Sequence, residues 1–414
     1  MANKTTKDSK ITSPLDDLSA TPRNPRGVAM GAAFLMAMAA VGPGFLTQTA
    51  TFTGQMGANF GFAILICIIF DIIVQMNVWR IIVVSGKKAQ VIANDIFPGL
   101  GYFLSFLVGL GGLFFNIGNV GGAGLGLNVL FGISPENGAV IAAALAILIF
   151  VVKNALTVMD RTVQVLAFVK VAILVYIIFI MAVPYHEAVQ HTFLPTKIDF
   201  YSIVTIVGGT VGGYISFSGG HRLIEGGLRG KQNIKYVNEG ALTGIGIASV
   251  IRVLLFLAGL AVVVAGNQLD PTNPAASIFK IAAGNFGYKF FGILLFAAGM
   301  TSILGSTFTS TSFLDYAVGS QKGAFAKYRK ALILSFIIVS TVIFYFIGNP
   351  AKVLVFVGAA NGFVLPISLA ILLIAGSSAK IIGTYKHPKW LTYSGWLVVL
   401  FMAYASLKTV IGLF

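Results

Sequence analysis

Long runs of apolar residues follow one another along most of this chain, with short polar connections between them. A helix needs about 20 mostly apolar residues to cross the hydrocarbon core of a bilayer. Runs of that kind lie at roughly 28–54, 59–84, 100–131, 138–157, 162–184, 200–220, 239–266, 286–313, 331–348, 351–376 and 390–412. Charged residues make up 10% of the 414 residues, whereas a soluble domain carries about 25%. The sequence therefore predicts an all-α integral membrane protein with eleven transmembrane helices.

Glycine and proline interrupt two of these runs, one at the start of each half of the chain. The first interruption is 41–45, where Pro43 lacks a backbone N–H and forces a helix to kink or open. The second is 208–214, which is rich in glycine, a residue that adopts backbone conformations others avoid. Two broken helices at corresponding places in two halves are the best sequence indication of a transporter's central site. Close helix packing is the alternative explanation, since small residues are common where membrane helices touch.

We expect a substrate to bind between these two breaks, beside the third apolar run. The predicted binding residues are Gly42, Pro43, Gly44, Phe45, Gln48, Asn116, Asn119, Gly209, Thr210, Gly212, Gly213 and Tyr214. Asn116 and Asn119 could equally be interhelical hydrogen-bonding residues without contact to a substrate.

Lysine and arginine concentrate in alternate connections, which places those connections on the cytoplasmic side. The connection after the sixth run, for example, holds Arg222, Arg229, Lys231 and Lys235. We therefore predict a multi-pass protein of the plasma (inner) membrane, with its N-terminus in the cytoplasm and its C-terminus outside.

The apolar runs divide into two sets of five and a final extra one. The polar residues 1–27 predict a disordered cytoplasmic tail, and 28–414 predict one transmembrane domain. A first repeat would span 28–184 and a second 200–376, followed by a last helix at 390–412. Because five is odd, the two repeats must have opposite orientations, which is the inverted-repeat plan of many secondary transporters.

Several functions find no support in the sequence. Cys67 is the single cysteine, so a disulfide framework and a multi-cysteine metal site are excluded. There is no Gly-x-x-x-x-Gly-Lys-Ser/Thr run, so ATP-driven transport is not expected, and no nucleophile–base arrangement indicates an enzyme. We expect no cofactor, no metal-ligating side chain and no nucleic-acid partner. The expected partners are the lipid bilayer and a small solute or ion; the oligomeric state stays open.

Four motifs resemble those of one transporter family. The run from Asn116 to Gly121, continuing to Ile133, is similar to an Asp-x-x-Glu-x-x-Gly helix that ends in Leu-Asn-Leu-Leu-Phe-Gly. Gln75 and Arg80, the run 298–302 and Leu365-Pro366 resemble parts of the second, eighth and tenth helices. The family is that of the natural-resistance-associated macrophage proteins (NRAMP), which are proton-coupled divalent metal transporters. The resemblance implies a LeuT-type fold.

The metal-binding motifs of that family are replaced in this chain. Where the family has Asp-Pro-Gly-Asn on helix one, the chain has Gly42-Pro43-Gly44-Phe45, and where it has Met-Pro-His on helix six, the chain has Gly212-Gly213-Tyr214. The acidic pair of helix three is Asn116 and Asn119. Hard divalent cations prefer carboxylate oxygens, and thioether or imidazole groups select softer ones. We therefore expect that this chain does not carry transition metals.

The groups that remain suit a small anion. The second half of a broken helix exposes free N–H groups and the positive end of its dipole, and glycine lets a ligand approach that backbone closely. The hypothesis is a secondary active transporter of a small anionic or carboxylate solute, and coupling to protons or cations is left open. One alternative is a divalent metal transporter, for Mn²⁺, Fe²⁺ or hydrated Mg²⁺. The second alternative is a non-concentrative channel or a sensor on the same scaffold.

Asp71 is the clearest ionisable residue at membrane depth, within the apolar run 59–84. Such residues are costly in a bilayer and are therefore functional candidates. Asp71 is the predicted coupling residue; the alternatives are a structural pair with Lys170 or Arg252, or a place beside a water-filled cavity. His221, with Arg222 and Glu225, is predicted to form a solvated cluster on the inner face.

Overall fold

The computed structural model describes residues 22–151, 171–317 and 324–411, and within them the regular structure is helical. Its elements are α1 Pro25–Ala40, α2 Pro43–Met56, η2 Gly57–Asn59, α3 Phe60–Ser85, α4 Ala89–Ile96, α5 Leu100–Phe131, α6 Pro135–Val151, α8 Tyr185–Phe193, α9 Phe200–Val211, α10 Ile215–Glu225, η3 Lys231–Asn233, α11 Ile234–Val264, α12 Pro274–Ala317, α13 Ala324–Ile347, α14 Pro350–Gly376, α15 Ala379–Ile382 and α16 Lys389–Ile411. A further helix, Val171–Ile180, precedes α8 at an angle of 114°.

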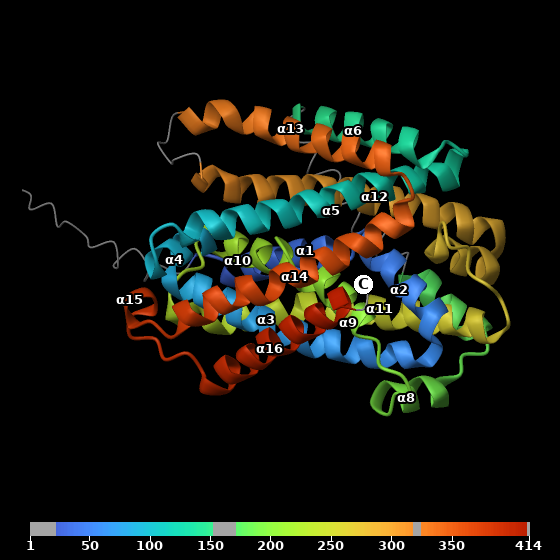
Figure 1. Cartoon of the computed structure of the whole chain (residues 1–414), viewed down its shortest axis with the longest axis horizontal. Helices are drawn as coiled ribbons and strands as arrows, with labels where there is room; N and C mark the ends of the chain where they lie inside the picture. The colour runs from blue at the N-terminus through green and yellow to red at the C-terminus, as the bar shows by residue number, and fades with distance from the viewer. Residues whose placement is uncertain (1–21, 152–170, 318–323, 412–414) are drawn as a thin grey trace, which may run out of the picture.

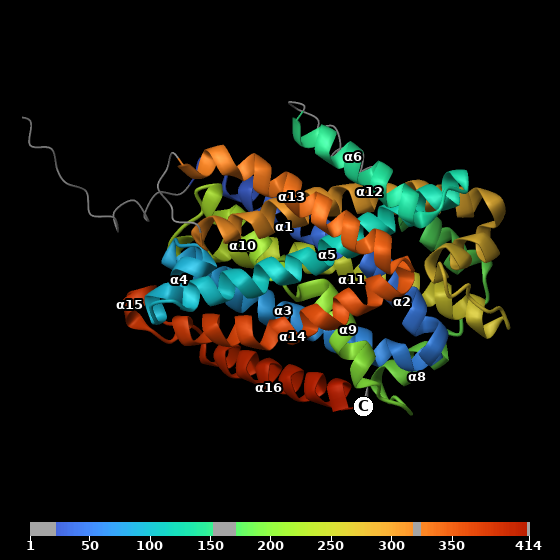
Figure 2. The same ribbon diagram turned by 45° about the horizontal axis from the view of Figure 1, so that its top comes forward.

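Most of the long helices run along the longest axis of the molecule (Figure 1). Helices α5 and α12 lie against each other over most of their lengths, and α14 packs against both α9 and α5. Helices α13 and α6 form one outer side and α16 the opposite one (Figure 2). The short helices α4 and α15 lie at one end of the long axis and α8 at the other, so the two ends correspond to the two faces of a membrane.

The outward faces of the helices are apolar, as a bilayer requires. Phe179 is 84% exposed and Phe346 is 83% exposed, which would be unfavourable in water but is expected of side chains that face lipid. The interior is filled by aromatic and aliphatic side chains, among which Trp79 is fully buried and donates from its ring N–H to the carbonyl of Ser216 at 3.1 Å. This packing fixes α3 against α10.

Eight helical stretches of the described chain are long and apolar enough to cross a membrane, or nine if the bent pair Val171–Ile180 and Tyr185–Phe193 counts as one span. Pro25–Ala40 and Pro135–Phe150 are shorter apolar helices. The multi-pass membrane architecture is therefore confirmed, and the count of eleven stays a prediction. Parts of the predicted runs 138–157 and 162–184, and most of the predicted tail, lie outside the described residues.

One predicted boundary was wrong. Helix α1 begins at Pro25, because the side chain of Asn24 accepts from the N–H of Gly27 at 2.9 Å and caps the helix; the tail therefore ends before 27. The first run, 28–54, is interrupted as predicted: it is two helices with a gap at 41–42. Helix α12 is kinked at Ala283 and Gly284; the helix after the kink begins close to the predicted 286, and a further helical segment from Pro274 precedes the kink.

Candidate functional site

The first break lies between α1 and α2. Val41 (φ −89°, ψ 41°) and Gly42 (φ −79°, ψ −174°) leave the helical conformation, and Pro43 is the first residue of α2, where its missing N–H is not needed. The last carbonyls of α1 and the first N–H groups of α2 therefore meet here without a helical partner. Pro43 to Phe45 do not themselves form the gap, although the sequence placed them in it.

The second break lies between α9 and α10. Gly212 is extended (φ −79°, ψ 169°) and Gly213 has a φ of +56°, a left-handed conformation that glycine adopts without the strain of a side chain. Gly208 to Val211 continue α9 as helix, so this break is narrower than the predicted 208–214. Both predicted interruptions are real, and each is two or three residues long.

A small cavity lies at the first break. It has a volume of about 10 Å³, which is roughly the room for one water centre. Its lining includes six of the predicted residues: Gly42, Gly44, Phe45, Gln48, Asn119 and Gly209. The remaining lining comes from Ala39, Ala40, Phe115, Leu354 and Val357. None of these described lining residues carries a charge, a thioether or an imidazole, so the cavity is a neutral cage of backbone, amide and apolar groups.

The other predicted residues lie around this cavity but not on its wall. Pro43 packs against Gly122 of α5, and the ring of Tyr214 meets the ring of Phe115 edge-on at 5.3 Å between centroids. Gly212 and Gly213 pack against Asn361 of α14. Thr210 faces a different cavity, described below. The breaks thus approach each other through Phe115 and α14 rather than by direct contact at one pocket.

Asn116 and Asn119 belong to a buried polar network between α5, α12 and α13. The Asn116 oxygen accepts from Ser306 at 2.9 Å and its amide donates to Ser340 at 3.0 Å. Asn119 lines the cavity and donates to Ser306 at 3.5 Å. The structure therefore makes Asn116 an interhelical hydrogen-bonding residue, whereas Asn119 is available to both the network and the cavity.

Several buried oxygen atoms near the breaks have no hydrogen-bond partner. They are Thr47 Oγ1, Gln48 Oε1, Ser302 Oγ and Asn361 Oδ1. Gln48 Nε2 donates to the carbonyl of Leu354 at 2.8 Å, which ties α2 to α14. An unsatisfied buried polar group costs about 1–3 kcal/mol, so such a group near a cavity indicates that a guest or water completes its bonding.

Asp71 and Arg252 share a second cavity of about 10 Å³ with Cys67, Thr210 and Phe45. Each of the two charged residues is 2% exposed. The Arg252 guanidinium donates to Cys67 Sγ at 3.0 Å and Thr210 Oγ1 at 2.7 Å, and it lies over the Phe45 ring at 4.0 Å from the centroid. The described salt bridges do not include a direct Asp71–Arg252 pair. Asp71 and Arg252 therefore share a cavity but do not form the direct pair that was one of the predictions. Lys170, the other predicted partner of Asp71, lies outside the described residues.

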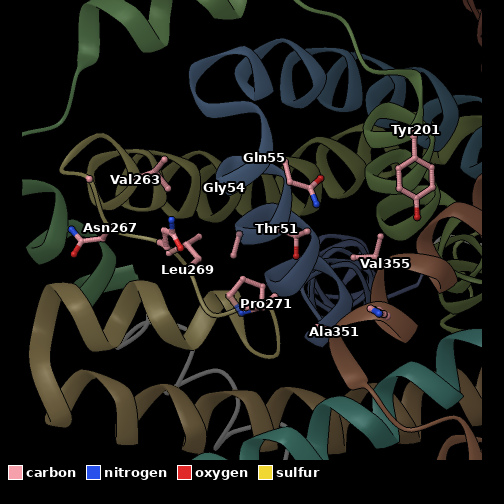
Figure 3. A pocket seen from close by; sticks show the side chains of 15 residues that line it. Thr51, Gly54, Gln55, Tyr201, Val263, Asn267, Leu269, Pro271, Ala351 and Val355 are labelled. Carbon is pink, nitrogen blue, oxygen red and sulfur yellow. The ribbon is translucent and has the colours of Figure 1, made fainter.

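A wide vestibule of about 870 Å³ opens beside α2, α9 and α14. Figure 3 shows its wall, with Thr51 and Gln55 from α2, Tyr201 from α9, Asn267 from the connection before α12 and Val355 from α14. Lys352 is its charged lining residue within the described chain. Gln48 and Leu354 line the central cavity and lie within one turn of the vestibule residues Thr51 and Val355 on the same helices, so the vestibule and the central cavity are adjacent along α2 and α14.

Sequence reasoning missed several residues of the site and misplaced one. Phe115, Leu354 and Val357 line the cavity but carry no signal, since an apolar residue in an apolar run looks the same whether it faces a cavity or a neighbour. His221 is 4% exposed and stacks on Phe313 at 5.0 Å between ring centroids. The predicted solvated cluster at His221 is thus wrong for the histidine, because α10 turns that side chain toward α12.

Comparison with known proteins shows relatives along almost the whole chain. The family model described as natural resistance-associated macrophage protein-like matches residues 33–412. An uncharacterized membrane protein YcsG of Bacillus subtilis is 56% identical over 92% of this chain and 93% of its own. The divalent metal cation transporter MntH of Staphylococcus haemolyticus is 23% identical over 93% of this chain and 92% of its own.

Solved structures share the fold at low sequence identity. The manganese transporter of Eremococcus coleocola, in complex with an aromatic bis-isothiourea compound, has a TM-score of 0.72 at 19% identity, over 94% of this chain and 87% of that one. MhsT in complex with L-phenylalanine has a TM-score of 0.61 at 17% identity, over 91% of this chain and 98% of that one. The all-helical, LeuT-like fold is therefore confirmed, whereas the exact helix count and the inverted repeats stay predictions.

Proposed function

This chain belongs to the natural resistance-associated macrophage protein-like family of membrane transporters, as its sequence motifs predicted, and we propose that it is a secondary active transporter of a small anionic solute. The solute is a small carboxylate, bound at the breaks in α1–α2 and α9–α10. Coupling to protons or cations drives its accumulation.

One observation carries the choice of an anion. The central cavity has no acidic side chain among its described lining residues, and the Arg252 guanidinium lies behind its wall, 4.0 Å from the centroid of the Phe45 ring, in a second cavity that it shares with Asp71. A buried guanidinium attracts an anion and repels a cation through a medium of low dielectric constant. The N–H groups of Gly44 and Phe45, in the first turn of α2 at the cavity, add donors for a carboxylate.

The vestibule supplies an entry route that also carries positive charge. Its polar lining residues are neutral amides and hydroxyls, with Lys352 as the charged one in the described part. A positive potential at the mouth of a cleft raises the local concentration of anions. Entry would require Gln48 to release the Leu354 carbonyl, since their 2.8 Å hydrogen bond closes the path between vestibule and cavity.

A divalent metal ion is the second candidate, and a different feature favours it. Ala39 and Ala40, at the carbonyl end of α1, line the cavity with the side-chain oxygens of Gln48 and Asn119. Carbonyl and amide oxygens are ligands for hard cations. The named function of MntH supports this candidate by relationship. The chain contains no group of three or more His, Cys, Asp or Glu that could hold a metal, within the described residues.

The proposed topology follows the charge distribution. The residues before Pro25 form a cytoplasmic tail, two inverted repeats span 25–184 and 200–376, and a last helix at 390–412 ends outside. This orientation places the vestibule on the extracytoplasmic face of the plasma (inner) membrane. A non-concentrative channel or a sensor is distinguished from this proposal by its failure to accumulate any solute against a gradient.

Uptake by proteoliposomes tests the function. Purified full-length protein is reconstituted, and uptake of ¹⁴C-labelled acetate, lactate and benzoate is compared with uptake of ⁵⁴Mn²⁺ under an inward proton gradient. Saturable, gradient-dependent uptake of a carboxylate supports the proposal. Saturable Mn²⁺ uptake without carboxylate uptake would overturn it in favour of the metal.

A further inference from the structure

The cavity shared by Asp71 and Arg252 is the feature of the molecule that the proposed site does not explain. Two opposite charges are buried at the same place, one from α3 and one from α11, without a direct salt bridge between them. Burial of a charge is unfavourable unless the charge is paired and hydrogen-bonded. A stable architecture would be expected to bring the two groups into contact, so their separation requires a reason.

The guanidinium is partnered mainly by neutral groups. It donates to Cys67 Sγ and Thr210 Oγ1, at 3.0 and 2.7 Å, and rests on the face of the Phe45 ring. Its Nε atom has no hydrogen-bond partner, and neither does Asp71 Oδ1. Arg252 therefore keeps donor capacity and uncompensated positive charge that a second anion could use.

Phe45 connects this cavity to the central one. Its ring lines both cavities, and it is the third residue of α2, next to the first break. Thr210, the other neutral partner of Arg252, is in the last turn of α9, next to the second break. The Phe45 ring thus lies between the central cavity and the guanidinium.

We propose that Arg252 is a shared counter-ion for which the anionic group of the solute and Asp71 compete, and that Asp71 takes up a proton when the solute engages Arg252. Without solute, the ionised Asp71 balances Arg252 through the cavity. When the solute contacts the guanidinium, two negative groups face one positive group in a medium of low dielectric constant. Asp71 then takes up one proton from the bulk solution on the side from which the solute enters. The solute and one proton are later released together, so the cycle moves no net charge for a monoanion.

The surroundings of Asp71 leave Arg252 as the charged group that acts on it. Helix α11 contributes Arg252, α9 the hydroxyl of Thr210, α2 the Phe45 ring, and α3 itself the thiol of Cys67. Helices α8, α10, α14 and α16 also pack against α3; among the described residues, Arg252 is the charged group that acts on Asp71, and Gln75 of α3 is a neutral one. The protonation state of Asp71 therefore depends on Arg252 and on the groups that Arg252 contacts.

Calorimetry tests this inference, which rests on the proposed function. Acetate, lactate and benzoate are titrated into the full-length protein at one pH, in phosphate and in Tris, whose ionisation enthalpies differ. The difference between the observed enthalpies measures the protons taken up on binding. We expect up to about one proton per carboxylate for the native protein, none for Asp71→Asn, and a loss of affinity of tenfold or more for Arg252→Gln.

Two further variants keep the result interpretable. The double variant Asp71→Asn/Arg252→Gln removes both charges, so it leaves no unpaired buried charge and serves as the test if a single variant fails to fold. It should bind carboxylate weakly and without proton uptake. Cys67→Ser keeps an acceptor for Arg252 and should retain proton uptake. Carboxylate binding without proton uptake in the native protein, or unchanged uptake in Asp71→Asn, would refute the inference and leave the proposed function standing. If no carboxylate binds while Mn²⁺ does, the proposed function itself fails.

Discussion

Gly208 and Gly209 are neighbours in α9. Replacing each by alanine adds one methyl group, and the two replacements should distinguish an effect on stability from an effect on substrate binding. A Cβ on Gly208 would overlap with the carbonyl oxygen of Gly358 and the backbone nitrogen of Gly362, and would lie 2.6 Å from Gly362 Cα. A Cβ on Gly209 would instead meet the end of the Gln48 side chain, with Nε2 at 2.9 Å and Cδ at 3.0 Å. The first set of atoms is backbone and cannot rotate away, whereas the second set can.

The expected magnitudes differ accordingly. Carbon atoms pack at about 3.5–4.0 Å, so Gly208→Ala must push α9 and α14 apart by about 1 Å, and overpacking of this kind costs about 1–3 kcal/mol. Gly209→Ala needs only a new Gln48 rotamer, which breaks the hydrogen bond to Leu354 and costs about 0.5–1.5 kcal/mol. The displaced amide also fills the central cavity, so binding should be lost although the fold is kept.

The assay compares both variants with the native protein by thermal unfolding, followed through tryptophan fluorescence, and by carboxylate uptake in proteoliposomes. We expect Gly208→Ala to lower the unfolding midpoint clearly, and Gly209→Ala to remain monodisperse with a small shift and little uptake. Native uptake by Gly209→Ala would refute the assignment of the central cavity. Equal destabilisation by both variants would refute the argument that the Gln48 side chain can move to accommodate a methyl group whereas the backbone of α14 cannot.

Three more predictions concern charge, access and pH. Gly44→Asp, whose Cβ has room at 3.5 Å from Gln48 Nε2, should fold and abolish carboxylate uptake, and unchanged uptake would contradict an anion site. Thr51→Cys, on the vestibule wall, should react with a charged thiol reagent while the buried Cys67 stays unlabelled in the native protein; labelling of Cys67 alone would contradict the assigned vestibule. Partial burial lowers the pKa of His387 from its ordinary 6.5 to about 4, so unfolded chains bind the proton first and stability should fall as pH drops from about 6.5 toward 4. His387→Asn should flatten that dependence of the unfolding midpoint on pH, and an unchanged slope would count against it.

The sequence predicted the helices and their breaks because those depend on local chemistry. An apolar run of sufficient length has to become a membrane helix, and Pro43 and Gly213 mark positions where a continuous helix is unfavourable. The gaps are nevertheless shifted from the predicted centres. Pro43 fits the first turn of α2 and leaves Val41 and Gly42 in the gap. Proline is favoured at the first position of a helix, but this preference can be applied only when the start of the helix is known.

The contents of the cavity walls could not be predicted in the same way. Leu354 and Val357 face the cavity because α14 crosses α2 and α9 at that level, and the crossing is set by tertiary packing. Arg252 was identified as an ionisable residue at membrane depth, yet its contact with Phe45 joins positions far apart in the chain. Asn116 and Asn119 have the same side chain and similar surroundings in sequence, and only the positions of Ser306 and Ser340 separate their roles.

The two cavities together explain in physical terms why the site prefers a guest of one charge. A cage of carbonyls, amides and apolar groups accepts either sign, so the discrimination must come from the charges behind Phe45. With Asp71 ionised, that pair is neutral overall; with Asp71 protonated, the charge of Arg252 is left uncompensated and the site favours an anion. Lower pH should therefore strengthen binding of a carboxylate and weaken binding of a dication at the same cage. The direction of the pH effect on affinity thus separates the two candidate substrates even before the physiological solute is identified, and a dication whose affinity rises as the pH falls would contradict the placement of the guest beside Arg252.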